Sequence, residues 1–143
     1  MSAQHFDTLI AEASRVRLNA YAPYSEFQVG AALLTSSGSI FVGCNFENAS
    51  YGLAICAERN AIGAMIAAGE QEIVAMAIIS PGSAAPCGAC RQVLNEFGPD
   101  CEILLLDANP PPPASRGLES SSRQQVYRLS ELLPHGFGPK NLM

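Results

Sequence analysis

The sequence predicts an α/β layer fold, and two observations carry this prediction. Segments with helical periodicity alternate with short apolar runs that are typical of strands. The first two strand-like runs are also joined by a turn short enough for a hairpin. The 143 residues are 48% hydrophobic and 15% charged, which is typical of a globular chain. We therefore expect a single domain that spans residues 1–143.

The first half of the chain predicts a helix, a hairpin and a second helix. Apolar residues recur at helical spacing in 3–21, and Pro23 limits that helix because the residue before a proline avoids the α region. The runs VGAALLT (29–35) and SIFVGCN (39–45) predict two strands joined by the turn SSG. Residues 55–68 predict a helix that is apolar on nearly every side. One side can meet the sheet and another a second subunit.

The second half alternates strands and helices until a proline-rich insert interrupts it. The run 72–80 is typical of a central strand, a short helix is expected at 87–97, and a further strand at 101–107. The insert 108–124 is too rich in proline for packed structure and predicts a mobile surface loop. Because this link holds no helix, we expect the strand at 125–129 to pair antiparallel with the strand before it.

Charge and hydropathy limit the class of partner. The formal net charge is −5 and no run of Lys or Arg is present, whereas a nucleic-acid partner calls for a basic stripe. A small, roughly neutral ligand fits this balance. No segment approaches the ~20 apolar residues of a membrane span, and the N-terminus lacks a signal-peptide pattern. The sequence therefore predicts a cytoplasmic protein whose five cysteines stay reduced.

Three of the cysteines begin the second and third predicted helices. Cys56 lies in the run CAE, and Cys87 and Cys90 lie in the run PCGAC, where a spacing of three residues lets both side chains clasp one ion. The positive end of a helix lowers the pKa of a thiol, and the thiolate is the form that binds metal. Three thiolates with one open position indicate a catalytic zinc, and a structural zinc with a fourth protein ligand is the alternative. Cys44 and Cys101 are expected to be buried, apolar thiols.

Charged residues next to these cysteines have predicted roles of their own. Glu58 has apolar neighbours, among which an idle carboxylate is costly, so we predict that it moves protons between water and substrate. Three thiolates outweigh the charge of one zinc ion. Arg59 and Arg91 are therefore expected to offset the excess and to hydrogen-bond the sulfurs.

Taken together, these motifs resemble the small zinc-dependent cytidine deaminases. The run CAE followed by PCGAC matches the zinc deaminase signature. Further matching segments are YAPYSEFQVGAAL, FENASYG, CAERNAI, PCGACRQVLNEF and LLPHGFGP, so the resemblance runs from Tyr21 to Phe137 apart from the insert. It implies a three-layer α/β/α fold with a five-stranded mixed sheet, a zinc cofactor and a homotetramer with shared active sites.

The resemblance also implies a reaction and a set of substrate contacts. The reaction is the hydrolytic deamination of cytidine and deoxycytidine to uridine and deoxyuridine, with release of ammonia, in pyrimidine salvage. Asn45 and Glu47 match residues that hydrogen-bond the ribose, and Phe27 matches the aromatic that packs against the base. The pyrimidine edge is held by the backbone of Ala57 and by Glu58. Three further positions match residues at sites shared between subunits: Ala49, Tyr51 and Phe137.

Three alternative functions stay open at this point. A deaminase of a cytosine-nucleoside antibiotic such as blasticidin S shares the chemistry, and assays side by side would separate the two. A deaminase that acts on a base within a polynucleotide needs a basic channel for the strand. A zinc-clamped binding or scaffold module would hold the metal and release no ammonia.

Overall fold

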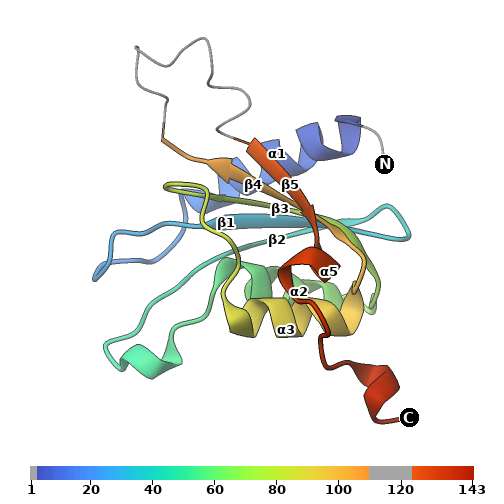
Figure 1. Ribbon diagram of the computed structural model, residues 1–143. Coiled ribbons are helices and arrows are strands. Elements are labelled where there is room, and N and C mark those ends of the chain that lie inside the picture. Colours follow the sequence, from blue (N-terminus) through green and yellow to red (C-terminus); the bar gives the residue numbers. More distant parts are fainter. Residues whose placement is uncertain (1–2, 110–123) are drawn as a thin grey trace.

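The computed structural model describes residues 3–109 and 124–143, and a five-stranded mixed sheet lies at its centre (Figure 1). The strand order is β2-β1-β3-β4-β5. The strands are β1 (Gly30–Thr35), β2 (Ile40–Cys44), β3 (Ile73–Ser80), β4 (Glu102–Asp107) and β5 (Gln124–Arg128). The helices are α1 (Ala3–Arg17), α2 (Ala57–Ala67), α3 (Gly88–Phe97) and α5 (Leu129–Leu132), with 3₁₀ turns η1 (Tyr51–Leu53) and η3 (Pro139–Asn141).

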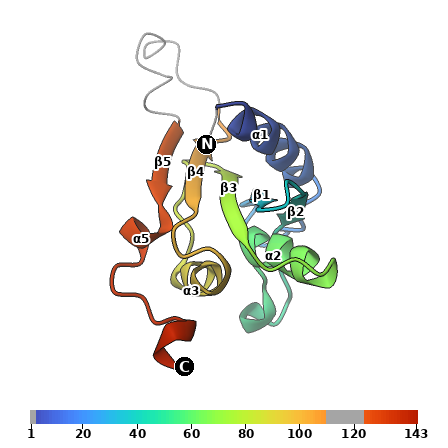
Figure 2. The same ribbon diagram turned by 90° about the vertical axis from the view of Figure 1, so that its right-hand side faces the viewer.

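Helices cover both faces of the sheet, α1 on one side and α2 with α3 on the other (Figures 1 and 2). The alternation of side chains along β1 explains the two layers of core. Ala32 and Leu34 pack with Leu9 of α1, whereas Ala31 and Leu33 belong to the cluster on the α2 side. The expected three-layer α/β/α fold with a five-stranded mixed sheet is confirmed.

The pairing of the strands places the starts of α2 and α3 at one edge of the sheet. β1 runs antiparallel to both β2 and β3, so β2 and β3 run in the same direction, and β4 is parallel to β3. The carboxyl ends of β2, β3 and β4 therefore share one edge. The chain leaves that edge to enter α2 after β2 and α3 after β3. The predicted hairpin of β1 and β2 and the predicted antiparallel pairing of β4 and β5 are both confirmed.

Two predicted boundaries differ from the structure. The first helix ends at Arg17 instead of residue 21, because the next residues form a turn and Tyr21 then pairs with Phe46 across a β-bridge. A long-range pairing ends this helix before Pro23 can. The predicted loop 108–124 lies mostly outside the described residues, and its last residue, Gln124, begins β5.

Among the residues that the structure describes, no helix combines the length and the apolar character needed to cross a membrane.

Helix α2 rests directly on β2 at Gly43. A Cβ atom at this position would lie 2.4 Å from the backbone nitrogen of Ala61 and 2.6 Å from the carbonyl oxygen of Ala57. Asn60 Nδ2 fixes the same contact from the helix side by donating to the carbonyl of Cys44 at 2.8 Å. The spacing between the start of α2 and the sheet therefore depends on the absence of a side chain at Gly43.

We expect Gly43→Ala to lower the free energy of unfolding by about 3 kcal/mol, because the added methyl group meets helix backbone that cannot rotate away. Chemical denaturation measures the change. Gly52→Ala is the matched control, since nothing lies within 4 Å of a Cβ added there. Equal stability of the two variants would contradict the tight docking of α2.

Candidate active site

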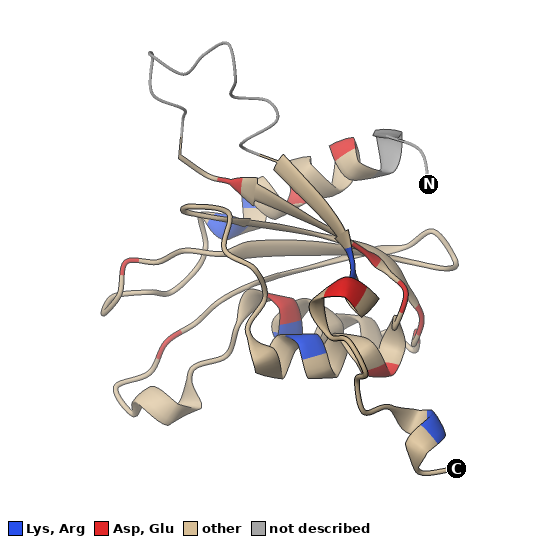
Figure 3. Cartoon of the chain, viewed as in Figure 1, with Lys and Arg blue, Asp and Glu red and all other residues tan. Residues whose placement is uncertain are grey.

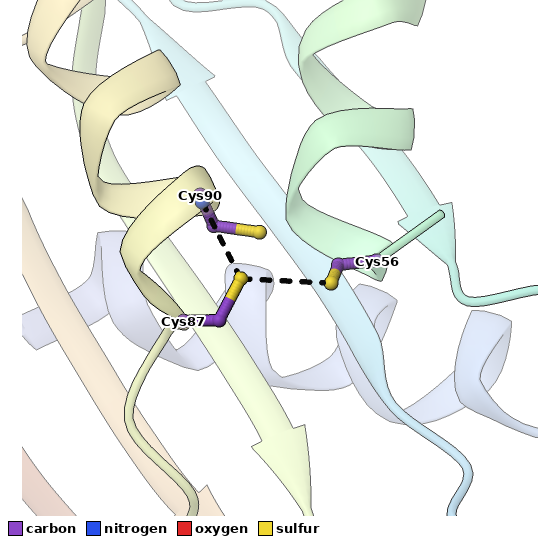
Figure 4. Close-up of side chains that lie close together, drawn as sticks. All are labelled: Cys56, Cys87 and Cys90. Atoms are coloured by element: carbon purple, nitrogen blue, oxygen red, sulfur yellow. Dashed lines mark hydrogen bonds between the residues drawn. The ribbon is translucent and has the colours of Figure 1, made fainter. Parts of the chain in front are cut away.

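The thiols of Cys56, Cys87 and Cys90 converge on one point between the starts of α2 and α3 (Figure 4). All three Sγ atoms lie within 4.8 Å of one another, and those of Cys56 and Cys87 are 3.8 Å apart. Two sulfurs that each lie about 2.3 Å from a tetrahedral zinc are about 3.8 Å from each other, so the cluster fits zinc. Within the described part of the chain, the group contains these three residues and no fourth ligand. That leaves one position open, as in catalytic zinc sites.

The starts of two helices position these three cysteines. Cys56 is the N-cap of α2 and Cys87 is the N-cap of α3. The backbone N–H of Cys90, in the first turn of α3, donates to Cys87 Sγ at 3.5 Å. Both helix N-termini therefore direct their positive ends toward the sulfurs, which favours the thiolate form.

The thiols differ in their readiness to ionise. Hydrogen bonds from Cys90, Arg59 and Cys87 lower the pKa of Cys56 to about 5. The pKa of Cys90 is raised, because its thiol hydrogen-bonds to Cys56 and is buried. A divalent cation at the cluster stabilises the thiolate form of all three residues. The donor set is therefore chemically suited to a soft or borderline metal such as zinc.

The two arginines predicted beside the sulfurs point to different partners. Arg59 donates from its NH2 group to Cys56 Sγ at 3.4 Å, and its hydrogen bonds to Cys56 and Cys90 raise its pKa. Arg91, for which the sequence predicts the same role, donates instead to the carbonyls of Pro86 at 2.7 Å and Leu132 at 2.8 Å. Successive residues of a helix point about 100° apart, so Arg91 is turned away from the face that bears Cys90.

Glu58 lies in the first turn of α2 and is only 5% exposed. Burial raises the pKa of its carboxyl to about 7, and the negative charge of Cys56 adds to this shift. A carboxyl with a pKa near neutrality both accepts and returns protons readily. The neighbouring Ala57 is fully buried, and its side chain packs in the core on the α2 side of the sheet.

A pocket of about 300 Å³ is lined by two of the predicted substrate residues, Glu47 and Tyr51. The other lining residues are Tyr24, Ser25, Asn48 and Ala54. The rings of Tyr24 and Tyr51 meet edge to face with 5.9 Å between their centres. One wall of the pocket is thus aromatic and another carries a carboxylate.

The side chain of Asn45 hydrogen-bonds the backbone of the loop that precedes β1, and this loop contains Phe27. Asn45 Oδ1 accepts from the N–H of Val29 at 2.8 Å, and Asn45 Nδ2 donates to the carbonyl of Phe27 at 2.9 Å. The ring of Phe27 is 38% exposed. The N–H groups of Tyr24 and Ser25 in the same loop donate to Glu47, so one short loop connects Asn45, Phe27 and Glu47.

Two predicted positions, Phe137 and Ala49, are not among the residues that line this pocket. Phe137 is 56% exposed, and its carbonyl accepts from Gln92 Nε2 at 2.8 Å and Asn95 Nδ2 at 3.0 Å. It is held on α3, beside a different pocket of about 450 Å³ whose lining contains no cysteine. Ala49 is exposed in the loop before η1.

The sequence reasoning did not single out four residues that organise these regions: Tyr24, Ser25, Gln92 and Asn95. The first two belong to the segment YAPYSEFQ, which carries part of the family resemblance and therefore offered a signal. The other two lie in PCGACRQVLNEF, which also carries the resemblance, but no local pattern predicts their contacts with the C-terminal segment, which span more than 40 positions.

Comparison with known proteins places the chain in a family. Residues 4–105 match the family model described as cytidine and deoxycytidylate deaminase zinc-binding region. The cytidine deaminase of Halalkalibacterium halodurans is 42% identical over 137 residues, which cover 94% of this chain and 95% of the relative. The cytidine deaminase of Mycobacterium tuberculosis is 38% identical over 139 residues, which cover 96% of this chain and 92% of the relative.

Solved structures agree with the sequence relatives. The cytidine deaminase from Burkholderia pseudomallei superposes with a TM-score of 0.80 at 42% identity, covering 96% of this chain and 100% of that one. The crystal structure of cytidine deaminase from Mycobacterium tuberculosis gives a TM-score of 0.74 at 36% identity, covering 93% of this chain and 97% of that one. With its three clustered thiols and this match over most of its length, the chain belongs to the zinc-binding cytidine and deoxycytidylate deaminase family.

Proposed function

We propose that the chain hydrolyses cytidine and deoxycytidine to uridine and deoxyuridine and releases ammonia, with zinc as its cofactor. The observation that carries this proposal is the cluster of three thiols with the buried carboxyl of Glu58 in the same helical turn as Cys56. Relatives that cover more than 90% of the chain are named cytidine deaminases, which supports the same substrate class.

The residues of the site divide the chemistry between them. Cys56, Cys87 and Cys90 would hold the zinc ion, which when bound supplies a nucleophile at neutral pH by acidifying water. Glu58 takes the proton that this water releases and delivers it to ring nitrogen 3, which makes carbon 4 electrophilic. Glu58 then takes the proton of the hydroxyl now on carbon 4 and passes it to the amino group. The bond from carbon 4 to the amino nitrogen breaks as the carbonyl forms, so water enters and ammonia leaves. Arg59 offsets the negative charge of the sulfurs.

The unused hydrogen-bonding capacity of Asn45 and Glu47 indicates how many hydroxyl groups of the sugar they can bind. Asn45 uses one N–H and one lone pair of its amide oxygen on the loop, which leaves its second N–H free to donate to a ligand. The carboxylate of Glu47 accepts from the N–H of Tyr24 at 3.0 Å, from the N–H of Ser25 at 3.3 Å and from the hydroxyl of Ser25. A carboxylate accepts about four hydrogen bonds, so about one position remains. One donor and one acceptor suit a single sugar hydroxyl.

Because deoxycytidine is a proposed substrate and lacks the 2′-hydroxyl, we expect Asn45 and Glu47 to hydrogen-bond the 3′-hydroxyl. Removing it should lower kcat/KM by about 100-fold, since a hydrogen-bond partner of a charged group is lost. Removing the 2′-hydroxyl should change kcat/KM by less than about threefold. Initial rates with cytidine, 2′-deoxycytidine and 3′-deoxycytidine measure both changes. Equal losses for the two deoxy compounds would contradict a single-hydroxyl site.

We further infer that the chain forms one deaminase domain that assembles as a homotetramer with shared active sites. The described residues build one sheet with helices on both faces, which supports a single domain. Exposed aromatic rings support assembly, because Tyr51 is 78% exposed and Phe137 is 56% exposed. The outer face of α2 is also apolar and exposed at Ala64, Ile66 and Ala67.

Cytoplasmic location and a free nucleoside as substrate are part of the same proposal. The structure leaves all five cysteines free, and a zinc site of three thiols is best kept reduced in the cytoplasm. The Lys and Arg residues of the described part of the chain lie at separate places on α1, α2, α3, the end of β5 and the C-terminal turn (Figure 3). A polynucleotide deaminase would need a continuous basic channel, so this arrangement favours a free nucleoside.

The test follows the ultraviolet absorbance of cytidine incubated with the purified protein and measures the metal content of the same sample. Loss of the cytidine band with about one zinc per chain is the expected result. If zinc is bound and cytidine persists, the same sample is assayed on blasticidin S. Ammonia released from that compound alone would replace the proposed substrate, and no ammonia from either would indicate a non-catalytic zinc module.

A further inference from the structure

The loop that precedes β1 is built around the hydroxyl of Ser25. This hydroxyl donates to Glu47 Oε2 and accepts from the backbone N–H of Phe27 at 3.0 Å. The direction of both hydrogen bonds is fixed, because a carboxylate cannot donate and a peptide N–H cannot accept. A single hydroxyl therefore ties the residue proposed to read the sugar to the residue proposed to pack against the base.

Side chains of the site bind both the backbone N–H and the backbone carbonyl of Phe27. Ser25 binds its N–H, and Asn45 Nδ2 donates to its carbonyl at 2.9 Å. Between Ser25 and Phe27, Glu26 has a φ of 60°, the left-handed region that costs a residue with a Cβ atom about 1 kcal/mol. Such a conformation persists only where neighbouring contacts enforce it. The Ser25 hydroxyl and the Glu26 N–H, which donates to the carbonyl of Ala22 at 2.9 Å, are two of those contacts.

We propose that Ser25 is a positioning residue that aims the carboxylate of Glu47 at the sugar hydroxyl and holds the ring of Phe27 for the base. This inference rests on the proposed function, since it assigns a role within the same nucleoside pocket. Ser25 itself lines that pocket of about 300 Å³ together with Glu47. Its hydrogen atom is committed to Glu47, so it acts through Glu47 and Phe27.

The consequence is a division between binding and chemistry. Without the Ser25 hydroxyl, Glu47 loses a charge-assisted hydrogen bond and the N–H of Phe27 loses its partner. We expect KM for cytidine to rise about tenfold, which corresponds to one such hydrogen bond. The cysteines and Glu58 lie at the starts of α2 and α3, whereas the Ser25 hydroxyl is bonded to Glu47 and Phe27, so kcat should stay within about threefold of the wild-type value.

The experiment compares Ser25→Ala, Ser25→Thr and the control Ser14→Ala in the full-length, zinc-loaded protein. Ser14 is exposed on α1, on the far side of the sheet. KM and kcat are measured with cytidine and with 3′-deoxycytidine. In Ser25→Ala the penalty for removing the 3′-hydroxyl should shrink by about fivefold or more, because Glu47 is no longer aimed at it. Threonine keeps the hydroxyl and should restore both KM and the penalty, and Ser14→Ala should change neither.

The outcomes separate this inference from the proposed function. A wild-type protein that does not deaminate cytidine overturns the function itself. A wild-type protein that does, with a Ser25→Ala variant of unchanged KM and undiminished penalty, overturns the role of Ser25. A Ser25→Ala variant in which kcat falls while KM stays constant also overturns the role of Ser25. Should Ser25→Ala melt at the assay temperature, Ser25→Cys keeps the side-chain volume with a weak donor and is read by the same criteria.

Discussion

Glu58→Gln is expected to retain zinc and the fold and to lower kcat by about 10³-fold. The amide keeps the shape of the carboxyl in its 5% exposed position but cannot take a proton from water or return one to the substrate. Loss of a positioned general acid and base accounts for about 10²- to 10⁴-fold in rate. Steady-state kinetics on cytidine and metal analysis of the same preparation measure the two properties together.

The stability of this variant adds an independent check. A buried carboxylate is costlier to desolvate than an amide, so Glu58→Gln should unfold at the same or a higher temperature. Glu72→Gln makes the same chemical change at an exposed position before β3 and should leave kcat unchanged. A Glu58→Gln variant that turns over cytidine at the wild-type rate would remove Glu58 from the proton transfers.

The positions of the cysteines were predictable because helix starts are local features. Cys56 and Cys87 follow short loops and precede helical periodicity, and the structure makes both of them N-caps. Their approach in space depends on strand directions, which the sequence left undetermined. It follows from β2 and β3 running the same way on either side of β1, so that α2 and α3 begin at one edge.

The features that the sequence did not predict depend on contacts between distant residues. The first helix ends early because Tyr21 pairs with Phe46, and Arg91 turns from the sulfurs to the carbonyl of Leu132. Glu47 was expected only as a sugar ligand, yet it also holds the backbone of the loop at Ser25, 22 positions away. No periodicity or local motif records such hydrogen bonds, because they form only when the loop and the end of β2 meet.

Cys87→Ala is expected to abolish zinc binding and turnover together. The cluster would retain two sulfurs, and removal even of groups that only orient metal ligands weakens binding about 10- to 100-fold, so loss of a ligand costs more. Cys87 is exposed and fills no core cavity. The fold should therefore survive, at a cost of about 1 kcal/mol for the altered N-cap of α3. Metal content after dialysis, cytidine turnover and circular dichroism are measured on one sample.

Cys44→Ala is the matched control, because it removes a half-buried thiol outside the cluster. It should keep about one zinc per chain and full turnover. A Cys87→Ala variant that still holds zinc and deaminates cytidine would show that another residue is the third zinc ligand.

Compared with Glu58→Gln, the result also distinguishes a catalytic from a structural zinc. If the zinc is structural, Cys87→Ala should unfold the chain and Glu58→Gln should change nothing. If the zinc is catalytic, Cys87→Ala should give a folded chain without metal, and Glu58→Gln should give a metal-loaded but inactive chain.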